Sequence, residues 1–459
     1  RQIQVLAAMS RQNSISQFQA DQAEKDELKF AGLQSEIKAP HFVMYVKDYL
    51  TKKYGSREVE QGGLDVITSL DYPTYEKMAQ LLKDGVNQQK SLSVGNGAAM
   101  VTNPKTGEIL AMIGSIDYFD NLHDGNVNVT LAQRSPGSSI KPLLYAQAFE
   151  KGTILPSTIL DDSPSVFTAA GAPPYIPQNY DNRFHGKIPA RIALASSFNI
   201  PAVKVMQKVG VSNFIEFAKT LGITTFTNPG RYGLSLSLGG GEIKMEDMVT
   251  AFSAFANGGL KTDLKPVLLV TDYQGKVMED NRSVTKTQPV LSAKTAFLIS
   301  NILSDDSARA PTFGSGSYLN IPNHAVSVKT GTTQEKRDNW TIGYTPSVLA
   351  VVWVGNNDNS PMSPYLESGR TGAAAIWNPI MTMLLKDKSS EPVSLPDNVV
   401  SLQICALNGL LTCQYCPNTV TEYFTKGTQP TTTCNFTKED LEKIIKEKEE
   451  REKATQPRP

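Results

Sequence analysis

The order of strand and helix patterns constrains the fold of this chain more than any other feature. Two apolar strand patterns, at residues 98–102 and 109–115, flank an Asn-Pro-Lys-Thr-Gly turn at residues 103–107, which is typical of a β-hairpin. Helical patterns then dominate, as in IPAVKVMQKVG, VSNFIEFAKTLG and MEDMVTAFSAFANGG, before β-patterns return at residues 325–354. This order predicts an α+β fold, in which the first and last strands are neighbours in an antiparallel sheet with helices packed on it.

Length and charge limit the classes of protein that need to be considered. The chain has 459 residues, 40% of them hydrophobic, which is enough for one large core with attached segments. Its 45 basic and 45 acidic residues cancel, so overall charge does not point to nucleic acid or to an anionic membrane surface. No apolar run approaches the ~18–20 residues that span a bilayer. The sequence begins at Arg1 and has no basic segment followed by an apolar one, so we expect any anchor to lie outside it.

The flanking segments differ from this central region. Residues 1–55 are polar and mostly helical in pattern, as in ISQFQADQAEKDELKF, and the pattern breaks at Gly62-Gly63. GGLDVITSLDYPTYEKMAQLLKDG then predicts a strand followed by an amphipathic helix. The last 23 residues form a run of mixed charge, which predicts a solvated helix or a disordered tail.

All four cysteines fall near the C-terminus, at Cys405, Cys413, Cys416 and Cys434. A zinc site with four cysteines usually shows two close pairs, and only Cys413 and Cys416 are so spaced. The spacing therefore favours disulfides over zinc, and all three possible disulfide connectivities stay open.

Few residues fit a nucleophile with its base. The chain has four histidines and no Gly-x-Ser-x-Gly elbow, which argues against a Ser-His-Asp triad, and no cluster of ligands predicts a catalytic metal. A serine activated by lysine is the remaining possibility. The Ser-x-x-Lys pattern occurs three times, at Ser35/Lys38, Ser138/Lys141 and Ser283/Lys286.

The middle copy has the most favourable context, within QRSPGSSIKPLLYAQAFEKG. Ser138 follows a Pro-Gly pair and is predicted to open a helix, on which Lys141 would lie on the same face. Free N–H groups at a helix N-terminus can stabilise an oxyanion, and a desolvated Lys141 with a lowered pKa can accept the hydroxyl proton. Pro142 is tolerated in a first helical turn.

Two further motifs follow in the sequence. Ser197-Phe198-Asn199 lies at a predicted turn, where a hydroxyl and an amide can relay a proton and hold a substrate amide. The triplet Lys329-Thr330-Gly331 continues the alternating pattern HAVSV, so it is predicted to lie in a strand whose edge can pair with an extended peptide.

The same three letters occur earlier, at Lys105-Thr106-Gly107. That copy lies between two strand patterns after Asn-Pro, so it is predicted to form a turn in which Gly107 supplies a positive φ and Lys105 points into solvent. In the later copy, Lys329 and the hydroxyls of Thr330 and Thr332 can face a carboxylate, and Gly331 is expected to leave space for the substrate.

Taken in order, Ser-x-x-Lys, Ser-x-Asn and Lys-Thr-Gly form the motif set of penicillin-binding proteins and serine β-lactamases. The chain resembles the transpeptidase region of a class A, bifunctional penicillin-binding protein over most of its length. The resemblance rests on RSPGSSIKP, QNYDNRFHGKIPARIALASSFNIPAV, LSLGGGEIKMEDMVTAFSAFANGG, VKTGTTQEKRDNWTIGYTP and VVWVGNNDNSPM. It implies the fold of that family, an antiparallel sheet flanked by helices with the site between sheet and helical lobe.

The resemblance also implies catalytic roles. Ser138 would be the acyl acceptor and Lys141 its general base. Ser197 and Asn199 would relay protons and align the substrate, and Lys329 would complete the catalytic set.

Substrate binding is implied for the strand that carries the second triplet. Lys329, Thr330 and Thr332 would bind a terminal carboxylate, with Gly331 beside them. The backbone N–H groups of Ser138 and Thr332 would form the oxyanion hole.

Four regions are implied along the chain. KAPHFVMYVKDYLTKKYG resembles the end of a glycosyltransferase domain, so residues 1–55 would be the remnant of that domain and residues 56–95 a linker. Residues 96–395 would form the transpeptidase domain, and residues 396–459 a cysteine-containing extension with a charged tail. No Glu-Asp-x-x-Phe motif of the glycosyltransferase occurs, so this chain is not expected to polymerise glycan strands, although its parent would.

The implied activity is crosslinking of D-Ala-D-Ala stem peptides of peptidoglycan, without metal or cofactor, on the outer face of a cytoplasmic membrane. β-Lactams would acylate Ser138 as substrate mimics. Three alternatives share the motifs: a serine β-lactamase, a D-Ala-D-Ala carboxypeptidase and a non-catalytic β-lactam sensor. No Glu-x-x-x-Asn that could serve a class A β-lactamase lies between Ser197 and Lys329. The identity of the acceptor amine stays open.

Overall fold

The structure is a computed structural model that describes residues 2–26, 37–168 and 173–455. Ser35, the last four residues of the charged tail and part of the first helical pattern lie outside these residues. The chain divides into two compact units, Arg1–Lys38 and Ala39–Pro459. The first contains the helices α1 (Gln2–Arg11) and α2 (Gln17–Lys25). The second unit contains all the elements and the site described below. The division into four regions, predicted from the sequence, stays a prediction.

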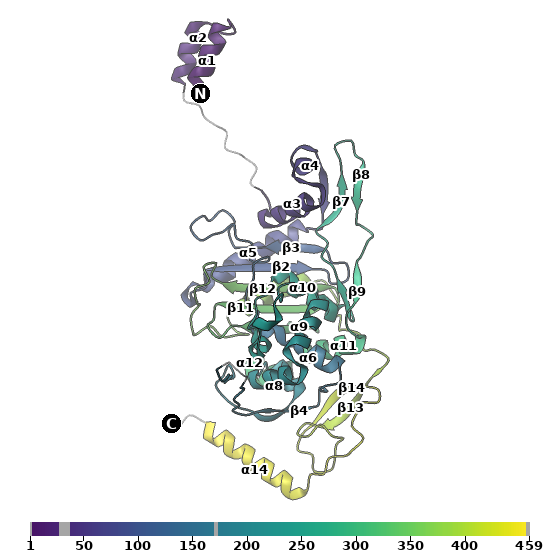
Figure 1. The fold of residues 1–459 in the computed structure, drawn as a ribbon. Coiled ribbons are helices and arrows are strands. Elements are labelled where there is room, and N and C mark those ends of the chain that lie inside the picture. The colour runs from purple at the N-terminus through teal and green to yellow at the C-terminus, as the bar shows by residue number, and fades with distance from the viewer. Residues whose placement is uncertain (1, 27–36, 169–172, 456–459) are drawn as a thin grey trace. The chain divides into compact units, whose positions relative to one another are not determined.

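A five-stranded antiparallel sheet lies at the centre of the second unit (Figure 1). Its strands, in spatial order, are β10 (Ser327–Thr332), β11 (Asp338–Thr345), β12 (Val348–Gly355), β2 (Asn96–Thr102) and β3 (Ile109–Ile113). The late strand β12 pairs with the early strand β2, which confirms the predicted neighbourhood of first and last strands. Strand β10, which carries the second Lys-Thr-Gly triplet, lies at one edge.

Helices cover both faces of this sheet, so its three central strands β11, β12 and β2 are buried throughout. Along β2, Ala99 and Val101 join a core with α5 (Tyr72–Gln88) and α13 (Ala373–Leu385). Their neighbours Ala98 and Met100 join the larger core, with α6 (Lys141–Glu150), α10 (Met245–Ala256) and α11 (Ala293–Ser304). This alternation follows from the two-residue period of a strand.

The remaining elements of the second unit surround these layers. The helices are α3 (Pro40–Tyr54), α4 (Ser56–Gln61), α7 (Ala190–Ala195), α8 (Asn199–Val209), α9 (Val211–Thr220), α12 (Asp306–Phe313) and α14 (Lys438–Thr455). The short strands are β1 (Asp65–Thr68), β4 (Ile159–Asp162), β5 (Gly186–Pro189), β6 (Leu260–Thr262), β7 (Val267–Thr271), β8 (Val277–Asp280) and β9 (Thr287–Pro289). The hairpin of β13 (Val399–Cys405) and β14 (Thr419–Thr425) follows near the C-terminus. Within the described residues, no helix is both long and apolar enough to span a bilayer.

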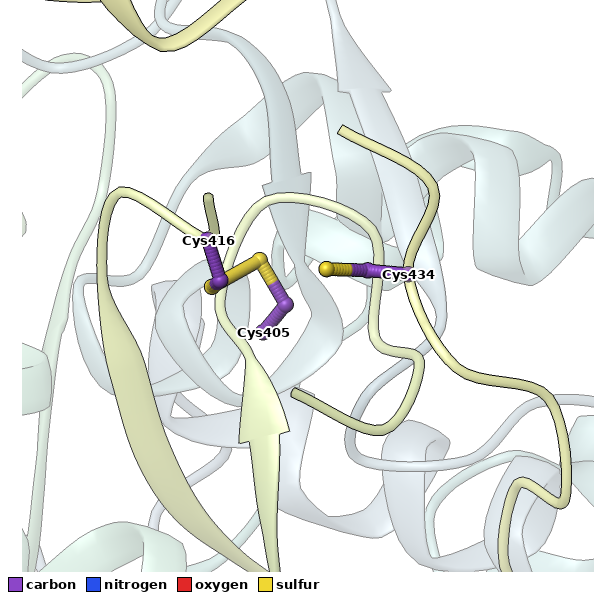
Figure 2. Close-up of side chains that lie close together, drawn as sticks. All are labelled: Cys405, Cys416 and Cys434. Carbon is purple, nitrogen blue, oxygen red and sulfur yellow. A yellow bond between two sulfur atoms is a disulfide. The ribbon is translucent and has the colours of Figure 1, made fainter. Parts of the chain in front are cut away.

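Two disulfides stabilise the C-terminal hairpin, one joining Cys405 to Cys416 and the other Cys413 to Cys434. This confirms the preference for disulfides and selects one of the three connectivities. Figure 2 shows how closely these side chains gather, and the sulfur atoms of Cys405, Cys416 and Cys434 lie within 4.8 Å of one another. A sulfur atom in a disulfide is not a thiolate, so the oxidised cluster does not offer the ligands that zinc requires.

Candidate active site

Ser138 lies in a short 3₁₀ turn, Gly137–Ile140, and the α-helix α6 begins only at Lys141. The sequence had predicted a helix from Ser138 onward. The difference follows from Pro142, which lacks the N–H that would bond the Ser138 carbonyl in an α-helix. The N–H of Lys141 donates to that carbonyl instead and closes the tighter turn. Positions i and i+3 of a 3₁₀ turn eclipse one another, so Ser138 and Lys141 still share a side.

Lys141 is fully buried and points toward the Ser-x-Asn motif. Its Nζ lies 2.7 Å from the carbonyl oxygen of Ser197 and 2.7 Å from Oδ1 of Asn199. The carbonyl oxygen of Phe198 is 3.2 Å away. Among the described residues, the Ser138 hydroxyl has no hydrogen-bond partner, so the predicted contact between Lys141 and that hydroxyl is not formed in this structure.

Lys329 approaches the same motif from strand β10. Its Nζ donates to the Ser197 hydroxyl over 2.8 Å and to the Thr330 carbonyl over 2.9 Å. The Ser197 hydroxyl is also 3.4 Å from Nζ of Lys141. One serine hydroxyl thus lies between two buried lysines, which is the arrangement that a proton relay requires.

Burial changes the protonation of both lysines. Desolvation, helped by the nearby charge of Lys329, holds the pKa of Lys141 well below its usual value, while the carboxylate of Asp162 partly opposes this shift. Desolvation and the positive charge of Arg309 lower the pKa of Lys329 to about 7. The lowered pKa of Lys141 favours the neutral amine, which is the form that a general base requires.

The turn that carries Ser197 is held from several sides. Ser197 has a left-handed backbone with φ of 63°, which is costly for a residue other than glycine. The Ser196 hydroxyl donates to the Ala308 carbonyl over 2.8 Å, and the Thr312 hydroxyl donates to the Ser196 carbonyl over 2.7 Å. Contacts of this kind are needed to maintain a strained turn.

Asn179 is a site residue that the sequence did not reveal. Its side-chain oxygen accepts the backbone N–H of Asn199 over 2.7 Å and so caps helix α8. Its Nδ2 donates to both oxygens of the fully buried Asp162, at 2.9 Å and 2.7 Å. Asn179 lies within the quoted QNYDNRFHG block, but no local pattern indicates a partner 20 residues further along the chain.

Close backbone approach joins the Ser138 turn to strand β10. A Cβ atom on Gly331 would lie 2.1 Å from the carbonyl oxygen of Pro136 and 2.9 Å from the amide nitrogen of Ser139. A Cβ atom on Gly137 would lie 2.7 Å from the backbone of Thr332. The sequence had suggested that Gly331 leaves open space for the substrate. In the structure, the turn that carries Ser138 occupies this space. The glycine allows the turn to pack directly against the strand.

Gly331→Ala is therefore expected to displace Ser138 relative to strand β10 and to slow any reaction of the Ser138 hydroxyl about 100-fold, because small misplacements of reacting groups have effects of that size. Gly233→Ala is the control, since Gly233 has φ of −121° and no atom within 4 Å of a built Cβ. Stopped-flow measurement of the rate at which Ser138 is covalently modified compares the two variants. Wild-type rates in Gly331→Ala would contradict the packing argument.

A cavity of about 800 Å³ opens over these groups. Five of the predicted site residues line it, namely Ser138, Ser197, Asn199, Thr330 and Thr332. Other parts of its lining come from residue 176 and from residues 178–182, 312–313 and 364–368. Lys141 and Lys329 lie behind the lining. The site thus combines the Ser138 hydroxyl at the cavity surface with the buried amines of Lys141 and Lys329.

The Ser283/Lys286 copy and the first Lys-Thr-Gly triplet do not join this cavity. Ser283 and Lys286 are exposed in the segment between β8 and β9, and Ser35 lies outside the described residues. Gly107 has φ of 78° in the turn between β2 and β3, as predicted. Lys105 is at the surface, 3.6 Å from Glu391.

Comparison with known proteins agrees with this geometry. Residues 97–382 match the family "Penicillin binding protein transpeptidase domain", and residues 395–438 match "Penicillin-binding protein 1A, C-terminal domain". Penicillin-binding protein 2D of Bacillus subtilis is 32% identical over 445 residues, which cover 95% of this chain and 62% of that protein. Penicillin-binding protein 1A of Aquifex aeolicus is 30% identical over 364 residues, which cover 79% of this chain and 47% of that protein. The chain thus spans less than two thirds of either relative.

Solved structures share the fold. The crystal structure of penicillin-binding protein 1A from Haemophilus influenzae superposes with a TM-score of 0.78 at 21% identity, covering 94% of this chain and 82% of that one. The structure of PonA1 from Mycobacterium tuberculosis in complex with penicillin V gives a TM-score of 0.64 at 21% identity, covering 78% and 96%. These similarities confirm the α+β fold.

Proposed function

This chain belongs to the penicillin-binding protein transpeptidase family, and from that premise we propose that it is a serine D-Ala-D-Ala transpeptidase with Ser138 as its nucleophile. The observation that carries the proposal is the convergence of Lys141 and Lys329 on Ser197, in the wall of the cavity that contains Ser138. Its substrate is a peptidoglycan stem peptide, and β-lactams act as substrate mimics. The intact protein works on the outer side of the cytoplasmic membrane.

Acylation uses the two lysines differently. The Ser138 oxygen forms a bond to the penultimate D-Ala carbonyl carbon, while its proton passes to the neutral Lys141 amine, directly or through the Ser197 hydroxyl. The backbone N–H groups of Ser138 and Thr332 stabilise the oxyanion, a contribution of about 10²–10³ in rate per donor. The bond to the terminal D-Ala nitrogen then breaks, and the same proton returns to that amine.

Substrate orientation comes from the other motif residues. The ammonium form of Lys329, with the hydroxyls of Thr330 and Thr332, binds the terminal carboxylate. The Asn199 side chain, fixed by Lys141 and the Gln178 carbonyl, aligns the substrate amide. An amine from a second stem peptide finally attacks the ester and releases Ser138.

The test combines mass spectrometry with product analysis. After incubation with a fluorescent penicillin, one adduct is expected on the peptide that contains Ser138. With a D-Ala-D-Ala peptide and an added amine, D-Ala release and an amide product are expected. Hydrolysis of the peptide without amide product would favour a carboxypeptidase, rapid penicillin turnover a β-lactamase, and binding without acylation a sensor.

The pKa of Lys329 gives a further prediction. Because that pKa is lowered to about 7, the ammonium that binds the substrate carboxylate is lost as the pH rises through 7. The ratio k2/K, in which k2 is the acylation rate constant and K the dissociation constant of penicillin, is therefore expected to fall above pH 7. Lys329→Arg should move this fall to higher pH, because a guanidinium keeps its charge. A k2/K that stays constant up to pH 9 in the wild type would contradict the assignment.

A further inference from the structure

The C-terminal hairpin of β13 and β14 contains one carboxylate that is turned into the protein. Glu422 lies in the middle of β14, opposite Leu402, and is only 1% exposed. The neighbours Thr421 and Tyr423 are more exposed. A buried charge on a hairpin requires a partner of opposite charge.

The partner of Glu422 is Arg191 of helix α7, 231 residues earlier in the chain. The guanidinium donates two bonds to the carboxylate, from Nε over 2.9 Å and from Nη2 over 2.5 Å. Arg191 is itself 7% exposed and also donates to Asn301 and Asp305, over 2.8 Å and 3.2 Å. The hairpin is thus joined to three elements of the transpeptidase domain by one bidentate, desolvated ion pair.

Helix α7 connects this ion pair to the active site. It has six residues, begins one residue before Arg191 and ends directly before Ser196 and Ser197. Its far end is held by the hydrogen bonds of Ser196 to α12, described above. Its near end is held by backbone hydrogen bonds from Ala190 to Thr158 and from Arg191 to Pro156, and the Arg191 side chain adds the ion pair to these restraints. The strained backbone of Ser197 depends on restraints of this kind.

A second connection runs through helix α12. One oxygen of Asp305 accepts the N–H of Ala308 and caps this helix, while the other accepts from Arg191. Helix α12 carries Arg309, whose charge helps to lower the pKa of Lys329, and Thr312, which lines the cavity. The same arginine therefore orients two of the elements that shape the site.

Apolar contacts support the same arrangement. The rings of Tyr423 and Phe297 on α11 lie 5.1 Å apart, edge to face. Helix α11 in turn accepts, through the Ser300 carbonyl, a hydrogen bond of 2.8 Å from Ser327, two residues before Lys329. Figure 1 shows the hairpin as a separate lobe beside the helices.

We propose that the C-terminal hairpin is a positioning element of the active site, acting through Glu422 and Arg191 on the Ser197 turn. It contacts neither substrate nor Ser138. Its removal should slow acylation because Ser197 and Asn199 lose their orientation, and not because the protein unfolds. The expected effect on the acylation rate rests on the proposed function, whereas the ion pair between Glu422 and Arg191 does not.

The test compares two buried carboxylates in the full chain. Glu422→Gln keeps the shape of the side chain but removes the charge. Glu279→Gln is the matched control, because Glu279 is also largely buried, accepts from Tyr49 and Tyr54 and pairs with Lys53, joining α3 to β8 away from the cavity. Both changes are expected to lower the melting temperature.

Only Glu422→Gln is expected to lower k2, by about 10–100-fold, with K changed less than about twofold, because misplaced catalytic groups slow chemistry rather than binding. The rates are measured well below the melting temperature and corrected for active enzyme by penicillin titration. Arg191→Lys keeps the charge but loses the bidentate geometry, so it provides a milder variant with a smaller fall in k2 if Glu422→Gln does not fold.

Two results would overturn the proposal: a wild-type k2 in the folded Glu422 or Arg191 variant, or an equal loss in the Glu279 control. A wild-type chain that is not acylated at Ser138 would instead contradict the proposed function. The two failures are therefore distinguishable.

Discussion

Ser138→Ala is expected to abolish covalent labelling by penicillin, because the proposed ester forms on the Ser138 oxygen, whereas Ser197, which also lines the cavity, is held between the two lysines and is proposed to relay protons. The loss should be complete rather than partial, since an alanine side chain cannot form the ester. The melting temperature should hardly change. The Ser138 hydroxyl has no hydrogen-bond partner among the described residues, so its removal leaves no buried group unpaired.

The matched control is Ser139→Ala. Ser139 is fully buried beside the nucleophile, and its hydroxyl donates to the Pro136 carbonyl over 2.7 Å. This variant should lose stability by about 1 kcal/mol but still be labelled. Labelling is followed by gel fluorescence and intact-mass analysis. An adduct that persists in Ser138→Ala, for example at Ser35 or Ser283, would show that the nucleophile lies elsewhere.

The main sheet could be predicted because its information is local. Strands β2, β3 and β12 carry apolar side chains on both faces, β11 carries them on one face, and the hairpin turn at residues 103–107 is marked by Asn, Pro and Gly. The order of patterns then limits the topology, since an early hairpin and late strands can share one sheet. Local pattern and tertiary structure agree here.

The contacts within the site could be predicted only in part. The motif order identifies which residues gather, but Lys141 bonds the segment 197–199, which is 56 to 58 residues away, and its direction depends on the 3₁₀ turn. The role of Gly331 was misjudged for a similar reason. A glycine in a strand pattern indicates close approach, but the sequence does not say whether a ligand or another backbone approaches.

The cysteines and the Arg191–Glu422 pair show the same limit at longer range. Four cysteines within 30 residues predict a local crosslink, whereas the connectivity depends on how the hairpin pairs. Arg191 lies in an ordinary helical pattern and Glu422 in a strand pattern, so neither signals its partner 231 residues away. Such pairs become visible only when the packing of distant elements is known.

Lys329→Met is expected to lower k2/K and Lys105→Met to leave it unchanged, although both replace the lysine of a Lys-Thr-Gly triplet. Lys329 is buried on strand β10 behind the cavity lining, and its charge is proposed to bind the substrate carboxylate. Its loss should lower k2/K by about 10–100-fold, the equivalent of a charged hydrogen bond. Lys105 forms only an exposed pair with Glu391, so its replacement should leave k2/K unchanged and alter stability by less than about 1 kcal/mol.

The two variants also differ in their expected stability, because Lys329→Met is expected to be more stable than the wild type although its k2/K is lower. In the folded protein the pKa of Lys329 is about 7, while in the unfolded chain it returns toward 10.5, so the unfolded state binds more protons between these values. Stability therefore rises with pH across that window, and burial of the ammonium costs about 5 kcal/mol below pH 7. Lys329→Met relieves this cost with a side chain of similar length, so its melting temperature at pH 7 should exceed that of the wild type while k2/K falls. Equal effects of the two replacements on k2/K, or a lower melting temperature for Lys329→Met, would mean that Lys329 is held for stability and not for substrate binding.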